Sequence, residues 1–193
     1  MSDRRGRLTR LINRWFRGDR SDEDELWEIL VVELRKVAAS VLRRFRSHHT
    51  IQPADLLNEL YLELSREQGR QCPSRSHFFA LAAKALRRFL IDYERTHSRR
   101  PQGRPRTTIN TDLTIDRDRD PLGVIAFDDL LCRLAEFDPR GAEVVEMKVF
   151  AAMTWEQISE VTGRSMSTVK RDWKDAAAWL RSQYETRGRD GQR

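Results

Sequence analysis

Side chains suited to nucleic acid recur along one short stretch near the C-terminal end of the chain. Short hydroxyls and long cations make up its polar face: Ser167, Thr168, Lys170, Arg171 and Lys174. Cations of this kind contact phosphates, and hydroxyls hydrogen-bond both phosphates and base edges. An ordinary solvated helix would instead mix Glu with Lys, so these residue types favour a surface that binds DNA.

The residues around this stretch predict two helices separated by a tight turn. Thr154 and Gln157 have the spacing of a capping box at the start of the first helix. Gly163 supplies the positive φ that a short turn needs, and Ser165 is placed to cap the second helix. We interpret residues 154–180 as a helix-turn-helix whose second helix enters the major groove. The alternative is an ordinary helical hairpin, which would share the caps and the glycine but not the outward-facing chemistry.

The composition is that of a basic, helix-rich protein. The chain has 193 residues, a formal net charge of +6, 34% charged residues, and only 9 Gly and 6 Pro. A net positive charge favours an acidic partner, above all nucleic acid. The sequence contains no apolar run of membrane-spanning length and no signal-peptide core, so we expect no membrane insertion and a cytoplasmic location. Cys72 and Cys132 stand alone, without a CxxC motif, and we expect reduced, partly buried thiols.

The pattern of helices predicts an all-α fold with two small helical domains joined by a flexible linker. We place an N-terminal helical domain at residues 1–95, the linker at 96–123, a C-terminal domain with the helix-turn-helix at 124–185, and a disordered tail at 186–193. The linker has no hydrophobic period and no apolar face, which is typical of a tether.

The first predicted helix is basic and amphipathic and ends at Gly18. Arg10, Arg14 and Arg17 accompany apolar residues at helical spacing. Such a helix could lie on a membrane surface. A second helix follows at once, however, and this favours packing against that neighbour.

The third predicted helix, opened by Pro53, has an acidic and amide face. Asp55, Asn58 and Glu59 lie opposite a buried side of leucines. DNA would be repelled by this face, so it is either plain solvated surface or a docking face for a basic protein partner. The residues alone favour plain surface.

The fourth predicted helix, at about residues 77–95, combines cations with an aromatic side chain in its later turns. These residues are Arg87, Arg88, Tyr93 and Arg95. Cations interleaved with an aromatic ring suit single-stranded nucleic acid, because the ring stacks on bases while the cations contact phosphates.

Catalysis finds little support in the sequence. A metal-dependent nuclease would also be basic, and His48, His49, Asp55 and Glu59 lie close together. No His pair is spaced i and i+4 on one helix, and no repeated carboxylate motif is present. We therefore expect no catalytic residues, no metal and no cofactor, in a protein that is not an enzyme.

Four segments, taken in order, resemble bacterial sigma factors of the extracytoplasmic-function (ECF) type. They are LTRLINRWFRGD (8–19), HTIQPADLLNELYLEL (49–64), HFFALAAKALRRFLIDYER (77–95) and LAEFDPRGAEVVEMKVFAAMTWEQISEVTGRSMSTVKRDWKDAAAWL (134–180). The resemblance covers nearly the whole chain except the linker and the tail. It is nearest to members whose first helix ends in W-x-x-G-D and whose recognition helix reads T-V-K-R-D-W.

The resemblance implies a transcription initiation factor that joins core RNA polymerase in the bacterial cytoplasm and directs it to promoter DNA. Its third helix would then dock on polymerase through Asp55, Asn58 and Glu59, which overturns the preference for plain surface. An anti-sigma factor or another regulatory protein is a further partner that the resemblance admits. The linker would thread the polymerase channel, whereas the residues alone favour a simple tether.

The resemblance also assigns two DNA-binding roles. The loop at residues 68–76 and the fourth helix would melt the downstream promoter element and hold a flipped base. The candidates for this role are Arg87, Arg88, Tyr93 and Arg95. The helix-turn-helix would read the upstream element as duplex, through Ser167, Thr168, Lys170, Arg171 and Lys174.

One position in the turn and one in the first helix of the motif depart from the wider family pattern. Arg164 stands where an apolar residue usually follows the turn glycine, and Ser159 stands where Ala is usual. These changes predict a less tightly packed turn.

The alternative function is an autonomous helix-turn-helix repressor with the N-terminal helices as a dimerisation module. The acidic third helix separates the two functions, because a repressor has no use for polymerase.

Overall fold

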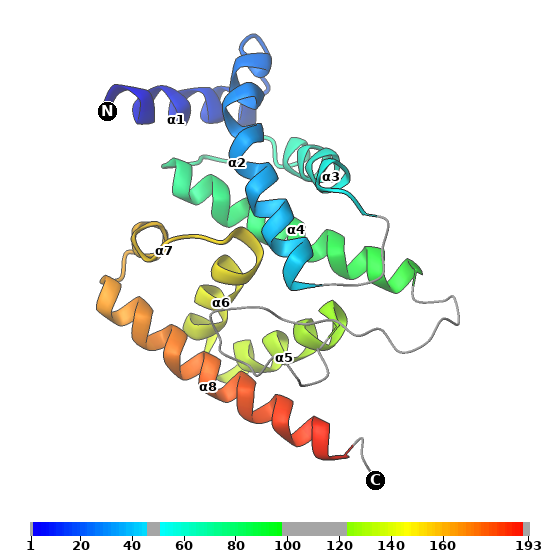
Figure 1. The fold of residues 1–193 in the computed structure, drawn as a ribbon. Helices are drawn as coiled ribbons and strands as arrows, with labels where there is room; N and C mark the ends of the chain where they lie inside the picture. The colour runs from blue at the N-terminus through cyan, green and yellow to red at the C-terminus, as the bar shows by residue number, and fades with distance from the viewer. Residues whose placement is uncertain (1, 46–50, 98–122, 191–193) are drawn as a thin grey trace.

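The computed structural model describes residues 2–45, 51–97 and 123–190, and these residues contain helices and no strand (Figure 1). In chain order the helices are α1 (Ser2–Phe16), α2 (Glu23–Arg44), α3 (Pro53–Ser65), α4 (Arg75–His97), α5 (Val124–Phe137), α6 (Pro139–Ala151), α7 (Trp155–Thr162) and α8 (Met166–Asp190). The all-α fold class predicted from the sequence is confirmed.

Helices α1 to α4 pack their apolar faces together in the N-terminal half. Trp15 and Phe16, at the end of α1, are buried. The Trp15 ring lies 5.6 Å from that of Trp27 on α2, and the Phe16 ring lies 6.5 Å from that of Phe78 on α4, between centroids. The basic helix α1 therefore packs against its neighbours, as its sequence favours.

One carboxylate ties three parts of this half together. Oε1 of Glu23, at the start of α2, accepts hydrogen bonds from Trp15 Nε1 (2.7 Å), Arg20 Nη1 (2.9 Å) and the hydroxyl of Tyr61 on α3 (2.9 Å). Burial opposes ionisation of this group, but the hydrogen bonds from Trp15 and Tyr61 and the charge of Arg20 outweigh it and lower the pKa of Glu23.

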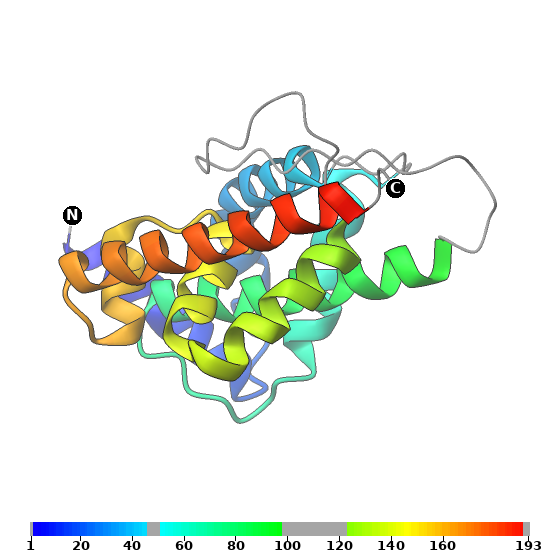
Figure 2. The ribbon, with the colours of Figure 1, turned by 90° about the horizontal axis from the view of Figure 1, so that it is seen from below.

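In the C-terminal half, α6 packs against both α5 and α8. Asp138 caps α6 by accepting a hydrogen bond from the backbone N–H of Gly141 at 2.9 Å. A Cβ at Gly141 would lie 2.1 Å from the Asp138 carboxylate and 2.9 Å from Cβ of Ala176, so glycine permits the close approach of α8. Figure 2 shows α8 running lengthwise across α6 and α5. Ala152 ends α6 with a left-handed backbone, at φ 51°.

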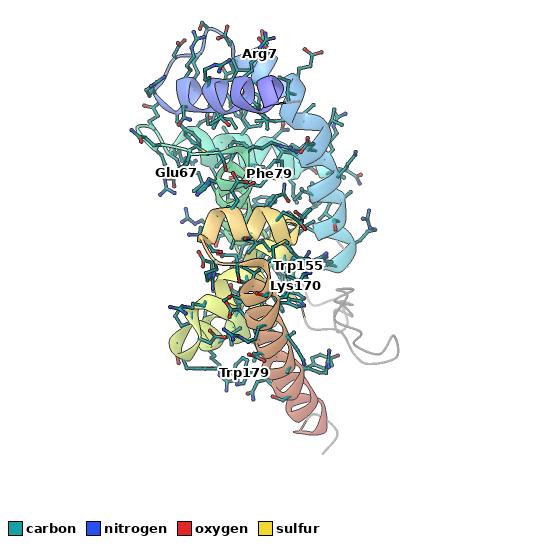
Figure 3. The ribbon with its side chains drawn as sticks, turned by 90° about the vertical axis from the view of Figure 1, so that its left-hand side faces the viewer. Arg7, Glu67, Phe79, Trp155, Lys170 and Trp179 are labelled. Atoms are coloured by element: carbon teal, nitrogen blue, oxygen red, sulfur yellow. The ribbon has the colours of Figure 1, made fainter. Side chains whose placement is uncertain are left out.

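The two halves share one hydrophobic core. Helix α4 packs against α5, α6 and α7, and α2 packs against α6. Phe45, directly after α2, stacks on Phe150 of α6 with 5.3 Å between ring centroids and 17° between planes, and it lies 5.7 Å from Phe127 of α5. Figure 3 follows the molecule from Arg7 on α1 to Trp179 on α8. The two helical units predicted from the sequence therefore lie against each other.

The predicted tail, linker and histidine pair lie partly or wholly outside the described residues. Helix α8 continues to Asp190, into the segment 186–193 that the sequence predicts as a disordered tail, and residues 191–193 lie outside the described part. The predicted linker covers residues 96–123. Thr96 and His97 belong to α4, and residues 98–122 lie outside the described part, as do His48 and His49. Within the described helices, none is long and apolar enough to cross a membrane.

Candidate nucleic-acid and protein interfaces

Helices α7 and α8, which cover the predicted helix-turn-helix, form with the caps that the sequence predicts. Thr154 Oγ1 accepts from the N–H of Gln157 at 3.3 Å, and Gln157 Oε1 accepts from the N–H of Thr154 at 2.8 Å, which completes the capping box. Gly163 has φ 67° in the turn between α7 and α8. Ser165 Oγ accepts from the N–H of Thr168 at 3.2 Å and so caps α8.

Helix α8 presents the predicted upstream-element residues on its outer side near its first turns. Ser167, Lys170, Arg171 and Lys174 are exposed, and Thr168 is half-buried. Their hydroxyls gather at the helix start, where Ser165 Oγ lies 2.9 Å from both Ser167 Oγ and Thr168 Oγ1. The structure therefore brings hydroxyls and cations together at the N-terminal end of one helix, which is the end that a recognition helix presents to base edges.

The opposite side of α8 is fixed by packing. Val169 is fully buried, and the ring of Trp173 lies 5.9 Å from that of Trp155 on α7, edge to face. Lys148 Nζ of α6 lies 4.1 Å from the centroid of the Trp155 ring and donates to the carbonyl oxygen of Met153 at 2.8 Å. These contacts fix the angle between α7 and α8 and hold the polar face outward.

Ser159 of α7 and Arg164 of the turn, which depart from the family pattern, contact each other. Ser159 Oγ donates to the carbonyl oxygen of Arg164 at 2.6 Å. The Arg164 guanidinium in turn donates to Glu143 of α6 at 2.7 Å and to Asp172 of α8 at 2.6 Å. The Arg164 and Asp172 side chains are only 15% and 13% exposed. A polar network thus connects α6, α7 and α8 where an apolar residue would otherwise pack.

The predicted protein-docking residues share one face of α3. Asp55 and Asn58 are exposed and Glu59 is half-buried, and Leu62, one turn further along the same face, is 48% exposed. Asp55 also has a structural role, because its Oδ2 accepts from the backbone N–H of Gln52 at 2.7 Å in a capping box. A substitution at Asp55 therefore disturbs the start of α3 as well as its surface.

The predicted downstream-element residues do not all share one face of α4. Arg88 and Arg95 are exposed and lie on the same side, since seven residues make two helical turns. Arg88 pairs with Glu63 of α3 at 3.2 Å and remains 68% exposed. Tyr93 is half-buried, with its ring 5.9 Å from that of Phe89. Arg87 lies on another side of α4, and its side chain is only 21% exposed.

Arg87 is enclosed by the C-terminal half. Its Nε donates to Asp128 Oδ1 of α5 at 2.6 Å, its Nη1 to Glu146 Oε1 of α6 at 2.8 Å, and its Nη2 to Cys132 Sγ at 3.2 Å. Burial opposes the charge of Arg87, but the hydrogen bonds and charges of Glu146 and Asp128 outweigh it and raise its pKa. In this conformation Arg87 binds two carboxylates, whereas the sequence predicts that it binds nucleic acid.

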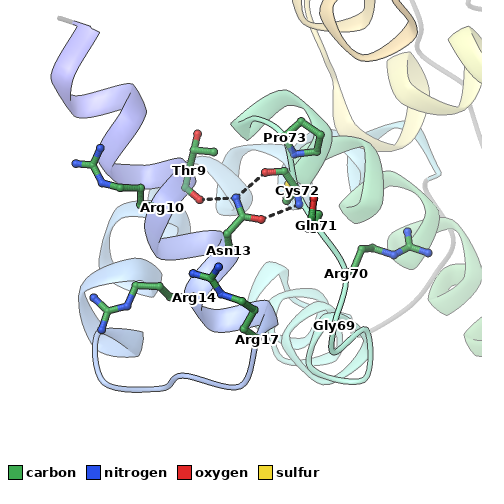
Figure 4. A pocket seen from close by; sticks show the side chains of 10 residues that line it. All are labelled: Thr9, Arg10, Asn13, Arg14, Arg17, Gly69, Arg70, Gln71, Cys72 and Pro73. Carbon is green, nitrogen blue, oxygen red and sulfur yellow. Dashed lines mark hydrogen bonds between the residues drawn. The ribbon is translucent and has the colours of Figure 1, made fainter.

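A basic pocket of about 510 Å³ opens between α1 and the loop that joins α3 to α4 (Figure 4). Its lining includes Arg10, Arg14, Arg17 and Arg70. Asn13 shapes it, because its Nδ2 donates to the Cys72 carbonyl oxygen and its Oδ1 accepts from the Cys72 N–H, both at 2.8 Å. The loop is thereby held on α1 before any ligand arrives.

The sequence does not assign helix α1 to this site. Arg10, Arg14 and Arg17 have the i, i+4, i+7 spacing of one helix face, and this signal could have drawn attention to them. The pairing of Asn13 with the loop could not be predicted, because its partner lies 59 residues away.

The cysteines and the acidic groups show no sign of a metal centre in the described residues. Cys72 is buried and Cys132 is exposed, whereas partly buried thiols were expected, and both are free. Burial raises the pKa of the Cys72 thiol to about 11. Among the side chains that the structure places, no three His, Cys, Asp or Glu residues are grouped to hold a metal ion.

Comparison with known proteins agrees with this geometry. The model of the family "ECF sigma factor" matches residues 5–186 of the 193-residue chain. Comparisons with curated proteins and with solved structures gave no match. The family match spans both halves, including the helix-turn-helix, the acidic face of α3 and the pocket beside α1. The chain therefore belongs to the ECF sigma factor family, whose members are transcription initiation factors that direct RNA polymerase to promoters.

Proposed function

We propose that each half of the chain makes a separate contact with the transcription machinery. The C-terminal half reads the upstream promoter element as duplex through Ser167, Thr168, Lys170, Arg171 and Lys174. The observation that carries this assignment is the start of α8, where these exposed or half-exposed polar groups lie on a capped helix. The first turn of a recognition helix contacts base edges in the same way in other helix-turn-helix proteins.

The N-terminal half docks on core polymerase through α3. Asp55, Asn58, Glu59 and the exposed Leu62 form one continuous strip of acidic, amide and apolar groups. An acidic surface on a chain of net charge +6 is of no use against DNA, and it suits a basic protein surface.

The same half melts the downstream element and holds the separated strand. Arg88, Tyr93 and Arg95 contact the strand along α4, and Arg87 joins them when α4 is free of the C-terminal half. The pocket beside the α3–α4 loop receives an extruded base, with arginines of α1 near its phosphates. Extrusion costs a few kcal/mol, and a pocket already held in shape by Asn13 lowers the additional cost of ordering.

The remaining features of the proposal follow from the family. The chain acts in the bacterial cytoplasm, without catalytic activity or cofactor of its own, and a separate protein such as an anti-sigma factor regulates it. ECF sigma factors often have such a partner. The two halves act as domains 1–95 and 124–185 when they engage promoter and polymerase.

Co-purification with core RNA polymerase tests the docking face. Because Asp55 caps α3, we use Glu59→Arg, which leaves the cap in place. The matched control is Glu28→Arg, the same charge change at an exposed position of α2. We expect the wild type and Glu28→Arg to retain polymerase at moderate salt, and Glu59→Arg to lose at least about tenfold in retention, as for a charge reversed within an interface. Equal retention of polymerase by all three would show that α3 is not the docking face.

A further inference from the structure

Arg164, in the turn between α7 and α8, directs its side chain into the C-terminal half. Its Nη2 donates to Glu143 of α6 at 2.7 Å and its Nη1 to Asp172 of α8 at 2.6 Å, and the side chain is only 15% exposed. A guanidinium can bond two groups in fixed directions at once, because its N–H donors lie in one plane. One side chain therefore ties α8 to α6.

The backbone of Arg164 is fixed as well. Its carbonyl oxygen accepts from Ser159 Oγ at 2.6 Å, and its N–H donates to Thr162 Oγ1 at 3.4 Å. Both partners belong to α7, so the bonds of the Arg164 side chain start from a fixed position. The cap residue Ser165 follows in the chain, and the proposed DNA-facing residues begin at Ser167. A shift of Arg164 would therefore move the start of that face.

Helix α8 approaches α6 at a second point further along. A Cβ on Gly141 would lie 2.9 Å from the Cβ of Ala176, so the two backbones are close there. This apolar contact has no directional bond, and by itself it would serve as a pivot for α8. Ser167 lies about 13 Å from Ala176 along the helix, at 1.5 Å per residue. A rotation of about 5° at the pivot would move Ser167 by about 1 Å, more than the roughly 0.5 Å range of hydrogen-bond lengths.

We propose that Arg164 is a positioning residue for promoter reading, which fixes the angle of α8 through Asp172 and Glu143 and so determines which duplex sequence α8 selects. The inference rests on the proposed reading of the upstream element by α8. Flexible cations on phosphates follow a small rotation of the helix, whereas hydrogen bonds to base edges do not. Loss of the Arg164 contacts therefore lowers selectivity among sequences more than affinity for duplex DNA in general.

Variants that spare the fold test this role in the full-length chain. Glu143→Ala removes the α6 end of the network at a side chain that is 47% exposed, so the protein should remain folded. The control is Glu136→Ala, which makes the same charge change at an exposed position of α5. Arg164→Lys keeps the positive charge, but a single ammonium lacks the planar fork that bonds two carboxylates.

The wild type first selects duplexes from a random-sequence pool. Fluorescence anisotropy then compares, for every protein, the most enriched duplex with a shuffled duplex of the same composition. We expect the ratio of the two affinities to fall about tenfold in Glu143→Ala and in Arg164→Lys, the discrimination that roughly one base contact supplies. Glu136→Ala should keep the wild-type ratio. Both glutamate variants should bind the shuffled duplex equally, since each removes one negative charge.

Urea unfolding of the same proteins separates positioning from stability. A lower ratio in Glu143→Ala at an unchanged unfolding midpoint supports the positioning role. The role is overturned if Glu143→Ala and Arg164→Lys keep the wild-type ratio, or if the ratio falls only in proteins whose midpoint also falls.

The selection also separates this inference from the proposed function. If the wild type enriches no sequence from the pool, the reading of the upstream element by α8 fails. Amide hydrogen exchange of residues 166–174 then decides whether Arg164 fixes α8. Faster exchange in Glu143→Ala than in Glu136→Ala supports that role, and equal exchange overturns it.

Discussion

Glu23 shows how a single side chain can fix the entry of a helix. Its one oxygen accepts from Trp15, Arg20 and Tyr61, and so connects α1, the turn before α2, and α3. The hydrogen bonds favour the ionised form, which is why the pKa of Glu23 lies below its ordinary value despite partial burial. The stability that this group contributes must therefore depend on its charge.

We expect Glu23→Gln to lower the free energy of unfolding at pH 7 by about 1–2 kcal/mol, the typical difference between charged and neutral hydrogen bonds. Because the folded pKa is lowered, the contribution is complete above the unfolded pKa of about 4.3 and is lost as the pH falls through the folded pKa. Urea titrations between pH 7 and pH 3 should show the difference between the two proteins shrinking. Glu28→Gln, at an exposed position of α2, is the control, and a pH-independent difference would exclude this role for the Glu23 charge.

At the scale of elements, the turn between α7 and α8 depends on a network that includes Arg164. Arg164→Ala leaves the largely buried Asp172 carboxylate without its cation. We expect a loss of about 2–3 kcal/mol in the free energy of unfolding, since breaking one side of a buried pair strands the other charge. Thermal or urea unfolding followed by tryptophan fluorescence measures this loss.

The control for this prediction is Arg140→Ala, an exposed arginine near the same turn. It should cost no more than about 0.5 kcal/mol, as for surface substitutions generally. Equal losses in the two variants would mean that the Arg164 network adds nothing to the turn.

The caps and turns could be predicted from the sequence where the residues that determine them lie close together in the chain. Thr154, Gln157, Gly163 and Ser165 act within a few residues of their own positions, and the structure places each in its predicted cap or turn. The end of α6 had no such signal, because Ala152 adopts the left-handed backbone that usually indicates glycine. The Arg164 network could not be predicted from the sequence either, since it depends on the approach of α6 to α8.

For the molecule as a whole, the family and its DNA-binding character could be inferred from segment order and charge, but the packing of the halves could not. The contact of Arg87 with Asp128 joins residues 41 apart in the chain, and nothing near either residue indicates it. The sequence alone therefore predicted Arg87 as a DNA contact, whereas this structure pairs it with Asp128 and Glu146.

The charge of the whole chain leads to a prediction about salt. Lys170→Ala with Lys174→Ala should weaken binding to any duplex and reduce the slope of log affinity against log salt by about 1.8, or 0.9 for each lost phosphate contact. Fluorescence anisotropy with a labelled random duplex at several salt concentrations measures both. Arg35→Ala with Lys36→Ala, at exposed positions of α2, removes the same charge and should leave the slope nearly unchanged. If the two pairs changed the slope equally, the cations of α8 would not be preferred phosphate contacts.

The aromatic cluster of Phe45, Phe127 and Phe150 limits how such a chain can be recombined during evolution or in the laboratory. A chimera that joins this N-terminal half to the C-terminal half of a relative would pair Phe45 with side chains selected for a different neighbour. Halves with a common interior therefore have to be inherited together, or exchanged together with the residues that face each other across it. If α8 reads the upstream element as proposed, grafting its outer face alone should transfer promoter specificity more simply, because that face takes no part in the shared interior.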